Sequence, residues 1–389
     1  MEDILLIGYG GVGAMYSYIL TKGGRARVTA VARSNYPAVK KHGVDIQSPK
    51  YGVVKGFRPH RICSSVAEAA NTNNPYTHVI ITTKSLPEVL PTSELVAPLL
   101  CPPYSTLFPQ PTYVLVQNGL GVERDLYRGL KEFNSDVEPK MITCSLYLMM
   151  RQITPNAIKH SDLDTLSIGI YRPKPNVTTN TSHEQEILTA FASILRPGGT
   201  EVIIVPEIQR IKFTKNVWNS VMGPITVLTR MGASAIFVSP ESSGSHQIKV
   251  IPVEAPPEGA TSDVPAAFPA IQEYSIPLIY DAFKEVAAVG VKAYPPAPED
   301  GVEGISPDIA ETVMRKVVNL ALKSDKDEKL SILVDAGLGR PMEVEVIVGE
   351  MVRMGRAMGI SMPRLETLYA VMCILQSHLV YQHKLKVSS

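Results

Sequence analysis

The sequence predicts an α/β chain in which a doubly wound parallel sheet is followed by an all-helical second half. The chain opens with a short apolar strand that runs into a glycine-rich turn, and strand-like and helix-like segments then alternate up to about residue 206. Such alternation is typical of parallel sheets covered by helices. After Pro206 the apolar residues recur mostly with helical periodicity. We therefore expect one domain at 1–206 and a second at 207–389, with an inserted loop at about 239–270.

The composition excludes several classes of function. The 389 residues carry a net charge of +1 with no long run of one sign, so we expect no nucleic-acid partner and no membrane partner. No apolar run approaches the roughly 18 residues of a membrane span, and the first residues do not have the pattern of a signal peptide. The four cysteines are far apart and the histidines lack metal-ligand spacing, so we expect no metal site and a cytoplasmic protein.

The first strand and its turn predict a dinucleotide site. Ile4–Ile7 is apolar, a G-x-G-x-x-G motif follows, and Ala14–Leu20 has the character of a helix. In this context the first glycine permits a tight turn, the second lets the backbone approach a pyrophosphate, and the third lets the helix pack against the strand. The free N–H groups of the helix favour phosphate. The alternative is a glycine-rich turn without a ligand. The predicted cofactor contacts are Gly8, Tyr9, Gly10, Gly11, Val12 and Gly13.

The end of the second predicted strand indicates which nicotinamide cofactor is bound. Arg27–Ala32 forms this strand and leads directly to Arg33 and Ser34. In a doubly wound sheet this position meets the adenosine ribose, where an acidic residue would bind the 2′-hydroxyl of NAD. A guanidinium instead suits a 2′-phosphate through paired hydrogen bonds. We therefore expect NADP (NADPH), with Arg33 and Ser34 as contacts; a surface arginine at a strand end is the alternative.

Two further strands end in polar residues. His78–Thr83 leads to Lys84, and Tyr113–Gln117 leads to Asn118 in an Asn-Gly turn. Because the carboxyl ends of parallel strands line the ligand crevice, both side chains are expected to meet cofactor or substrate. A solvated lysine and a turn without a ligand are the alternatives. Other strands are expected at 53–58, 60–63, 140–147, 166–171 and 200–205, with helices at 66–70 and 186–195.

The second half begins with a helix from Lys212 to Val227. Lys215, Asn219 and Gly223 recur at every fourth position, which puts them on one face. The Gly223-Pro224 pair should kink or end this helix. Ser331 is expected in a loop or short helix, and Glu343 in the first turn of a helix opened by Pro341, where a carboxylate also suits the helix macrodipole. Further helices are expected at 270–290, 307–323 and 363–381.

The chain resembles the ketopantoate reductase (2-dehydropantoate 2-reductase) family over nearly its whole length. The resemblance implies a Rossmann-type domain, a helical domain, an active site between them, and reduction of a 2-keto acid with NADPH. It rests on the glycine motif, Thr83-Lys84, the turn from Gln117 to Gly121, Lys215 to Asn219 followed by Pro224, and Ser331 twelve residues before Glu343.

The resemblance also implies roles for individual residues. Lys215 resembles the catalytic lysine that gives a proton to the carbonyl oxygen, and an ammonium would also stabilise the developing alkoxide. Asn219 is then expected to bind a substrate hydroxyl and Ser331 the substrate carboxylate. Glu343 resembles the carboxylate that orients the substrate or the lysine. Arg33, Lys84 and Asn118 resemble cofactor contacts, and Lys84 would lie near the nicotinamide, where it also meets substrate.

One position departs from the family pattern. Gly223 stands where the family usually carries a second substrate-binding asparagine, so a polar contact that discriminates between substrates is lost and space is opened. The leading hypothesis is reduction of 2-dehydropantoate (ketopantoate) to pantoate in pantothenate biosynthesis. The alternatives are a paralogous reductase for another keto acid or a specialised-metabolism ketone, a related hydroxy-acid or sugar-acid dehydrogenase, and a non-catalytic NADP-binding protein. Apolar surface on the last helices would support a homodimer.

Overall fold

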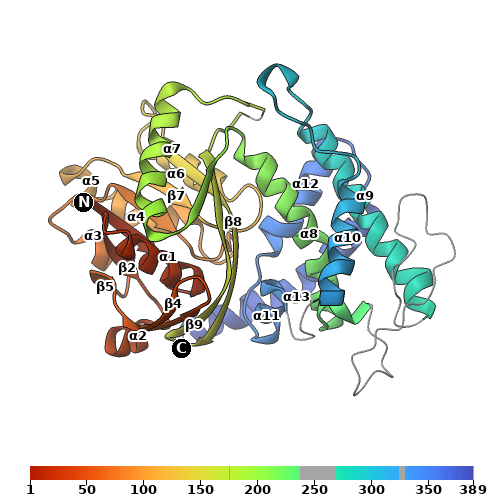
Figure 1. Ribbon diagram of the computed structural model, residues 1–389, viewed down its shortest axis with the longest axis horizontal. Coiled ribbons are helices and arrows are strands. Elements are labelled where there is room, and N and C mark those ends of the chain that lie inside the picture. The colour runs from red at the N-terminus through yellow and green to blue at the C-terminus, as the bar shows by residue number, and fades with distance from the viewer. Residues whose placement is uncertain (175, 237–268, 324–328, 389) are drawn as a thin grey trace. The chain divides into compact units, whose positions relative to one another are not determined.

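The chain divides into two compact units, Met1–Lys212 and Phe213–Ser389 (Figure 1). The computed structural model describes residues 1–174, 176–236, 269–323 and 329–388, and the side chains of 320–323, 387 and 388 also lie outside the description. The loop expected at 239–270 therefore lies outside the described residues up to residue 268. In Figure 1 the sheet belongs to the part coloured red to yellow-green, and the part coloured green to blue is helical.

The first unit is built on a ten-stranded sheet. Parallel strands run in the order β5-β2-β1-β6-β7-β8. This is a doubly wound order, because the strands after β1 are added first on one side of it and then, from β6 on, on the other side. Beyond β8 the sheet continues through β9, β3 and β4, and β10 pairs with β9. The strands are β1 Glu2–Ile7, β2 Ala26–Val31, β3 Val44–Ser48, β4 Gly52–Phe57, β5 Arg61–Cys63, β6 His78–Ile81, β7 Thr112–Leu115, β8 Met141–Thr154, β9 Ala157–Ile170 and β10 Glu201–Ile204.

Helices complete the first unit, and apolar residues from its strands and helices form one core cluster. Helix α3 has the predicted bounds, and the Ser65 hydroxyl caps it by accepting the Glu68 N–H at 3.0 Å. Helix α7 begins earlier than predicted because Thr181 and Glu184 form a capping box at its start. The helices are α1 Gly11–Lys22, α2 Tyr36–His42, α3 Val66–Ala70, α4 Thr92–Leu100, α5 Tyr104–Leu107, α6 Glu123–Phe133 and α7 Ser182–Leu195.

Strands β8 and β9 form an antiparallel ribbon that is much longer than predicted. Each strand has 14 residues, and the two are joined at Pro155 and Asn156. The prediction of strands at 140–147 and 166–171 found only the buried ends of this ribbon. The apolar run of β8 ends at Met150, and the polar and exposed residues that follow it up to Thr154 do not have the pattern of a buried strand.

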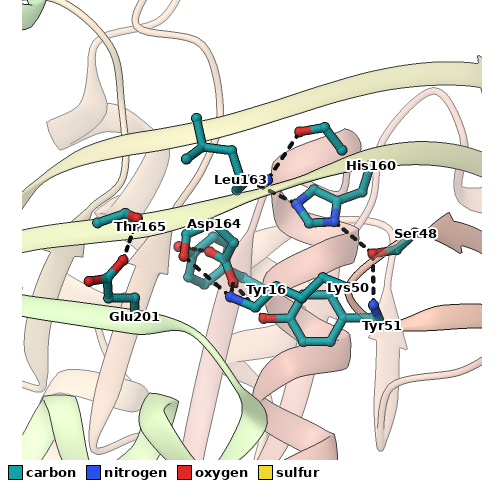
Figure 2. A network of polar contacts seen from close by, with 10 residues as sticks. Tyr16, Ser48, Lys50, Tyr51, His160, Leu163, Asp164, Thr165 and Glu201 are labelled. Atoms are coloured by element: carbon teal, nitrogen blue, oxygen red, sulfur yellow. Dashed lines mark hydrogen bonds and ion pairs between the residues drawn. The ribbon is translucent and has the colours of Figure 1, made fainter.

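A polar network holds helix α1 against strand β9 (Figure 2). The buried carboxylate of Asp164 accepts hydrogen bonds from the hydroxyls of Tyr16 on α1 and Tyr51 after β3, and Lys50 lies 3.5 Å from it. Burial, and then the nearby Asp164 charge, raise the pKa of both tyrosine hydroxyls, which therefore stay protonated as donors. The network fixes α1, the helix that follows the glycine turn, to strand β9.

The second unit is helical within the residues that the structure describes. Helix α8 begins in the first unit and continues in the second. Two π-helical turns, Ile271–Ser275 and Glu345–Gly349, lie next to α9 and α12. The helices are α8 Ile208–Thr229, α9 Ile276–Ala293, α10 Ile309–Lys323, α11 Ser331–Gly337, α12 Glu350–Ala357 and α13 Pro363–Ser388. None of the described helices is both long and apolar enough to cross a bilayer.

Two prolines of this unit differ from expectation. Of the two outcomes predicted for Gly223-Pro224, a kink or an end of the helix, the end is wrong, because α8 runs through both residues to Thr229. Because Gly223 has no Cβ, the usual clash between a proline ring and the preceding side chain is absent. The prediction that Pro341 opens a helix is also wrong, since Pro341–Glu343 is not helical and helical structure starts at Val344. The side chain of Gln376 instead binds both backbone groups of Met342, donating to its carbonyl and accepting from its N–H.

Candidate active site

The turn after β1 has the shape that the glycine motif predicts. Gly8 has φ = +99°, and a Cβ there would lie 2.8 Å from the backbone nitrogen of Thr83, so only glycine fits. A Cβ at Gly13 would lie 1.9 Å from the Gly8 carbonyl oxygen, which shows how closely α1 approaches β1. A Cβ at Gly10 would meet no atom of the described residues within 4 Å. The first and third glycines are thus required by the protein itself, whereas the second leaves an open approach to the helix N-terminus.

The neighbouring residues fix this turn to the rest of the sheet. Tyr9 is buried, and its backbone carbonyl accepts a hydrogen bond of 2.7 Å from the side chain of Asn35. The same amide also donates to the Pro155 carbonyl at the tip of the β8–β9 ribbon. Met150 of the ribbon lies 3.6 Å from the position of a Cβ on Gly11. Sequence reasoning missed both Asn35 and the ribbon; the Asn35 signal was a short polar residue two positions after the predicted Arg33.

Arg33 and Ser34 follow β2 directly and are exposed. Strand β2 is the neighbour of β1, with Ile7 opposite Val31, so these residues and the glycine turn lie at the same edge of the sheet. The Arg33 carbonyl accepts the Tyr36 N–H, which turns the chain into α2. The guanidinium is therefore at a strand end where an anionic group on a bound ligand can reach it.

Lys84 and Asn118 follow the next two strands at this edge. Strand β6 pairs with β1, and β7 pairs with β6. Lys84 is exposed and Asn118 is half-buried. The buried side chain of Gln117 donates to the Thr83 carbonyl at 2.9 Å and so joins the two turns. The four predicted cofactor segments of the first unit therefore end side by side on consecutive parallel strands.

A buried ion pair near this edge was missed by sequence reasoning. Glu123, the first residue of α6, is 0% exposed and accepts hydrogen bonds from Lys212, Thr143 and Gln209. Burial raises the pKa of the Glu123 carboxyl, but the Lys212 charge and the hydrogen bonds from Lys212 and Thr143 outweigh it, and the net direction is down. The pair is therefore ionised and ties the segment after Asn118 to the first turn of α8.

Helix α8 carries the predicted catalytic lysine in the second unit. Lys215 and Asn219 are half-buried and lie one turn apart, and the unbroken helix keeps Gly223 on the same face. Gly223 is buried, and a Cβ there would lie 3.5 Å from a methyl group of Ile332. The space that glycine leaves in place of the family asparagine therefore borders an apolar side chain.

Ser331 and Glu343 lie on the two segments that pack against the end of α8. Ser331 is exposed at the start of α11, and Glu343 is 5% exposed just before the π-helical turn. Their neighbours Ile332, Met342 and Val344 belong to one apolar cluster with Val227 of α8. The second unit thus gathers the segments of all four predicted residues around one small core.

The described part of the chain contains no group of three or more His, Cys, Asp or Glu side chains that could hold a metal ion. No disulfide links the four cysteines, all of which the structure describes. Burial raises the pKa of the Cys144 thiol, beside the Glu123 pair, so this thiol is unreactive.

The chain thus combines a doubly wound parallel sheet, the class of sheet that binds dinucleotides in many proteins, with a helical unit. Residues 4–173 match the family model described as ketopantoate reductase PanE/ApbA, and residues 259–376 match the model for the C-terminal part of the same family. The chain belongs to the ketopantoate reductase PanE/ApbA family. It is also 26% identical over 388 residues to the uncharacterized protein YDL144C of Saccharomyces cerevisiae, covering 97% of this chain and 95% of that protein.

Solved structures share the fold. The 2-dehydropantoate 2-reductase of Methylococcus capsulatus is 24% identical, with a TM-score of 0.65 and 97% of each chain covered. A D-mandelate dehydrogenase solved with NADH and anilino(oxo)acetate is 14% identical, also with a TM-score of 0.65, covering 97% of this chain and 99% of the other. At these identities the likeness describes the fold alone.

Proposed function

We propose that this protein reduces a 2-keto acid to a 2-hydroxy acid with NADPH, and that 2-dehydropantoate is the first substrate to test, as in pantothenate biosynthesis. The observation that carries the proposal is the set of four predicted cofactor segments that end on consecutive strands β2, β1, β6 and β7. This is the crevice in which doubly wound sheets bind dinucleotides. The open approach at Gly10 fits the pyrophosphate of such a cofactor, because no protein atom occupies it.

The cofactor residues have distinct proposed tasks. The backbone N–H groups from Gly10 to Gly13 would hold the pyrophosphate at the start of α1. Arg33 and Ser34 would bind the 2′-phosphate, and no acidic side chain follows β2 directly to repel it. Asn118 and Lys84, after β7 and β6, would contact the nicotinamide half. When bound, the reduced nicotinamide supplies a hydride to the carbonyl carbon.

The residues of the second unit supply the remaining chemistry in this proposal. Lys215 would donate a proton to the carbonyl oxygen and stabilise the negative charge that develops there. Glu343 would orient Lys215 or the substrate, and Ser331 would bind the substrate carboxylate. Asn219, one helical turn after Lys215, would bind a hydroxyl group.

A second candidate, an apolar 2-keto acid, is favoured by the surroundings of Gly223. A methyl group of Ile332 borders the position where the family carries an amide, so a substrate group there would meet apolar surface. Sites built around a hydroxyl reject analogues through that contact, and here it is missing. Replacing Gly223 by Asn should favour hydroxylated keto acids, since the new Cβ would sit in ordinary contact with Ile332.

The test is NADPH oxidation by the full-length chain with 2-dehydropantoate beside a panel of aliphatic and aromatic 2-keto acids. We expect turnover with preference for NADPH over NADH, and a loss of at least about a hundredfold in kcat for Lys215→Ala with unchanged NADPH binding. The matched control is Lys316→Ala, an exposed lysine on α10. A wild-type chain that binds NADPH but reduces no keto acid would support the non-catalytic alternative. Unchanged turnover in Lys215→Ala would remove this lysine from the mechanism.

We further infer a homodimer and a cytoplasmic location. Four exposed apolar side chains on α13, at Val371, Ile374, Tyr381 and Leu385, follow one face of the helix, and such a face can pair with its own copy. The absence of a disulfide among the four described cysteines suits a reducing compartment. The location can be checked by fractionation of cells that express the chain.

A further inference from the structure

Asn216 is a buried polar residue next to Lys215 that the proposed mechanism does not use. Its side chain is on α8 and the residue is 2% exposed. Successive residues on a helix point about 100° apart, so Asn216 lies on a different face from Lys215. A polar side chain with so little exposure needs a partner inside the protein.

The partner of Asn216 lies in the segment that follows Glu343. The Asn216 amide donates a hydrogen bond of 2.9 Å to the carbonyl oxygen of Ile347, in the π-helical turn Glu345–Gly349. The N–H of the same Ile347 donates to the Glu343 carbonyl at 3.1 Å. A single residue thus links the side chain beside Lys215 to the backbone of Glu343. Such π-helical turns are rare and occur frequently at functional sites.

The oxygen atom of the Asn216 amide, Oδ1, is buried without a hydrogen-bond partner among the described residues, which is unfavourable for stability. An aliphatic side chain at this position would avoid this penalty. The one favourable polar contact of the side chain is therefore the hydrogen bond to Ile347.

The segment before Glu343 is anchored as well. The Gln376 amide on α13 accepts the Met342 N–H at 2.9 Å and donates to the Met342 carbonyl at 2.8 Å. The backbone of Glu343 is therefore held on one side by α13 and on the other by α8. Of these two helices, α8 is the one that also carries Lys215.

We propose that Asn216 is a positioning residue that fixes the backbone of Glu343 relative to Lys215. The inference rests on the proposed function, in which these two residues are the catalytic groups. Catalytic groups must be held within a fraction of an ångström, and small misplacements cost much of the rate. Asn216 would thus act on turnover through Ile347, without touching substrate or cofactor.

The test compares Asn216→Ala and Asn216→Leu with the wild-type chain. Leucine keeps the size of the side chain but has no donor for Ile347, so it serves if the alanine variant does not fold. We expect amide hydrogen exchange at Ile347 to become at least about tenfold faster. We also expect kcat to fall by about tenfold to a hundredfold while the KM for NADPH is unchanged.

The matched control is Ser220→Ala. Ser220 lies one turn further along the buried side of α8, and its hydroxyl bonds only to Val217 within the helix. It should leave exchange at Ile347 and kcat unchanged. Unchanged exchange in both Asn216 variants would overturn the proposal, and so would faster exchange with unchanged kcat. A wild-type chain that reduces no keto acid would refute the proposed function instead, and the exchange rates alone would then decide whether Asn216 holds Glu343.

Discussion

His78 lies buried at the start of β6, and its titration should make the fold sensitive to acid. Burial lowers the pKa of its imidazole to about 4, well below the ordinary 6.5. Between these values the unfolded chain binds a proton that the folded chain excludes. The free energy of unfolding should therefore fall as pH drops through this window, by about 1.4 kcal/mol per pH unit and about 3 kcal/mol in all.

The variant His78→Gln removes this titration. Urea unfolding at pH 7.5 and pH 5 should show a loss of stability that is about 2 kcal/mol smaller in the variant than in the wild-type chain. His183→Gln is the control, because that histidine is exposed beside Glu186. An equal loss in wild type and His78→Gln would show that this histidine does not carry the acid sensitivity.

Single residues differ in how far the sequence reveals them. Gly8 and Gly13 were predictable because the short motif requires a tight turn at the first glycine and close helix packing at the third. The contacts around both glycines leave no room for a side chain, as the motif requires. Asn35, Glu123 and Asn216 were not predictable, since each acts through a partner far away in the chain, at Pro155, Lys212 and Ile347. The local sequence does not name these distant partners, and for Asn35 it shows only a short polar residue after Arg33.

At the scale of elements, short buried strands and the capped helix α3 were predicted best. The apolar runs Ile4–Ile7 of β1 and Val79–Ile81 of β6 predict buried strands, and Ser65 marks the start of α3. Errors arose where tertiary contacts overrode a local signal. Pro224 lies inside α8, and Pro341 precedes a segment that Gln376 holds out of the helix. The proline rule describes the cost of a proline in a helix but not what surrounding contacts offset.

Helix α13 presents two apolar faces, and the exposed one carries the dimer prediction. Leu365, Met372 and Leu379 are buried, whereas Ile374 is 75% and Tyr381 63% exposed. A charge in the middle of the exposed face should prevent the pairing of two copies, because it would be buried without a partner. Sedimentation velocity should therefore find a dimer for wild type and a monomer for Ile374→Glu.

A control variant separates this effect from a general gain in charge. Leu107→Glu changes an equally exposed apolar residue on α5 of the first unit and should leave the dimer intact. A wild-type chain that sediments as a monomer at all accessible concentrations would contradict the dimer.

At the scale of the whole molecule, the Glu123–Lys212 pair joins α6, β8 and α8 through one buried contact. Removing one member of the pair should leave the other charge buried without a counter-charge. We expect Lys212→Met to lower the free energy of unfolding by about 3–5 kcal/mol, and the double variant with Glu123→Gln to recover most of the loss. Urea unfolding curves of the single and double variants provide the measurement.

The exposed pair Lys55–Asp45 is the natural comparison. Its atoms lie 2.8 Å apart, yet the lysine side chain is 68% exposed. Lys55→Met should change stability by less than about 1 kcal/mol, since exposed ion pairs contribute little. Equal effects at both sites would mean that burial is not what gives the Glu123 pair its importance.

The division of α8 between the two units determines how the protein can be cut. A fragment that stops at residue 206, where the strand pattern ends, lacks Gln209 and Lys212 and leaves Glu123 buried without its cation. A fragment that keeps the first turns of α8 retains the pair. The smallest piece of the first unit that folds by itself should thus end inside a helix, and a fusion joint is better located after Lys212 than at residue 206.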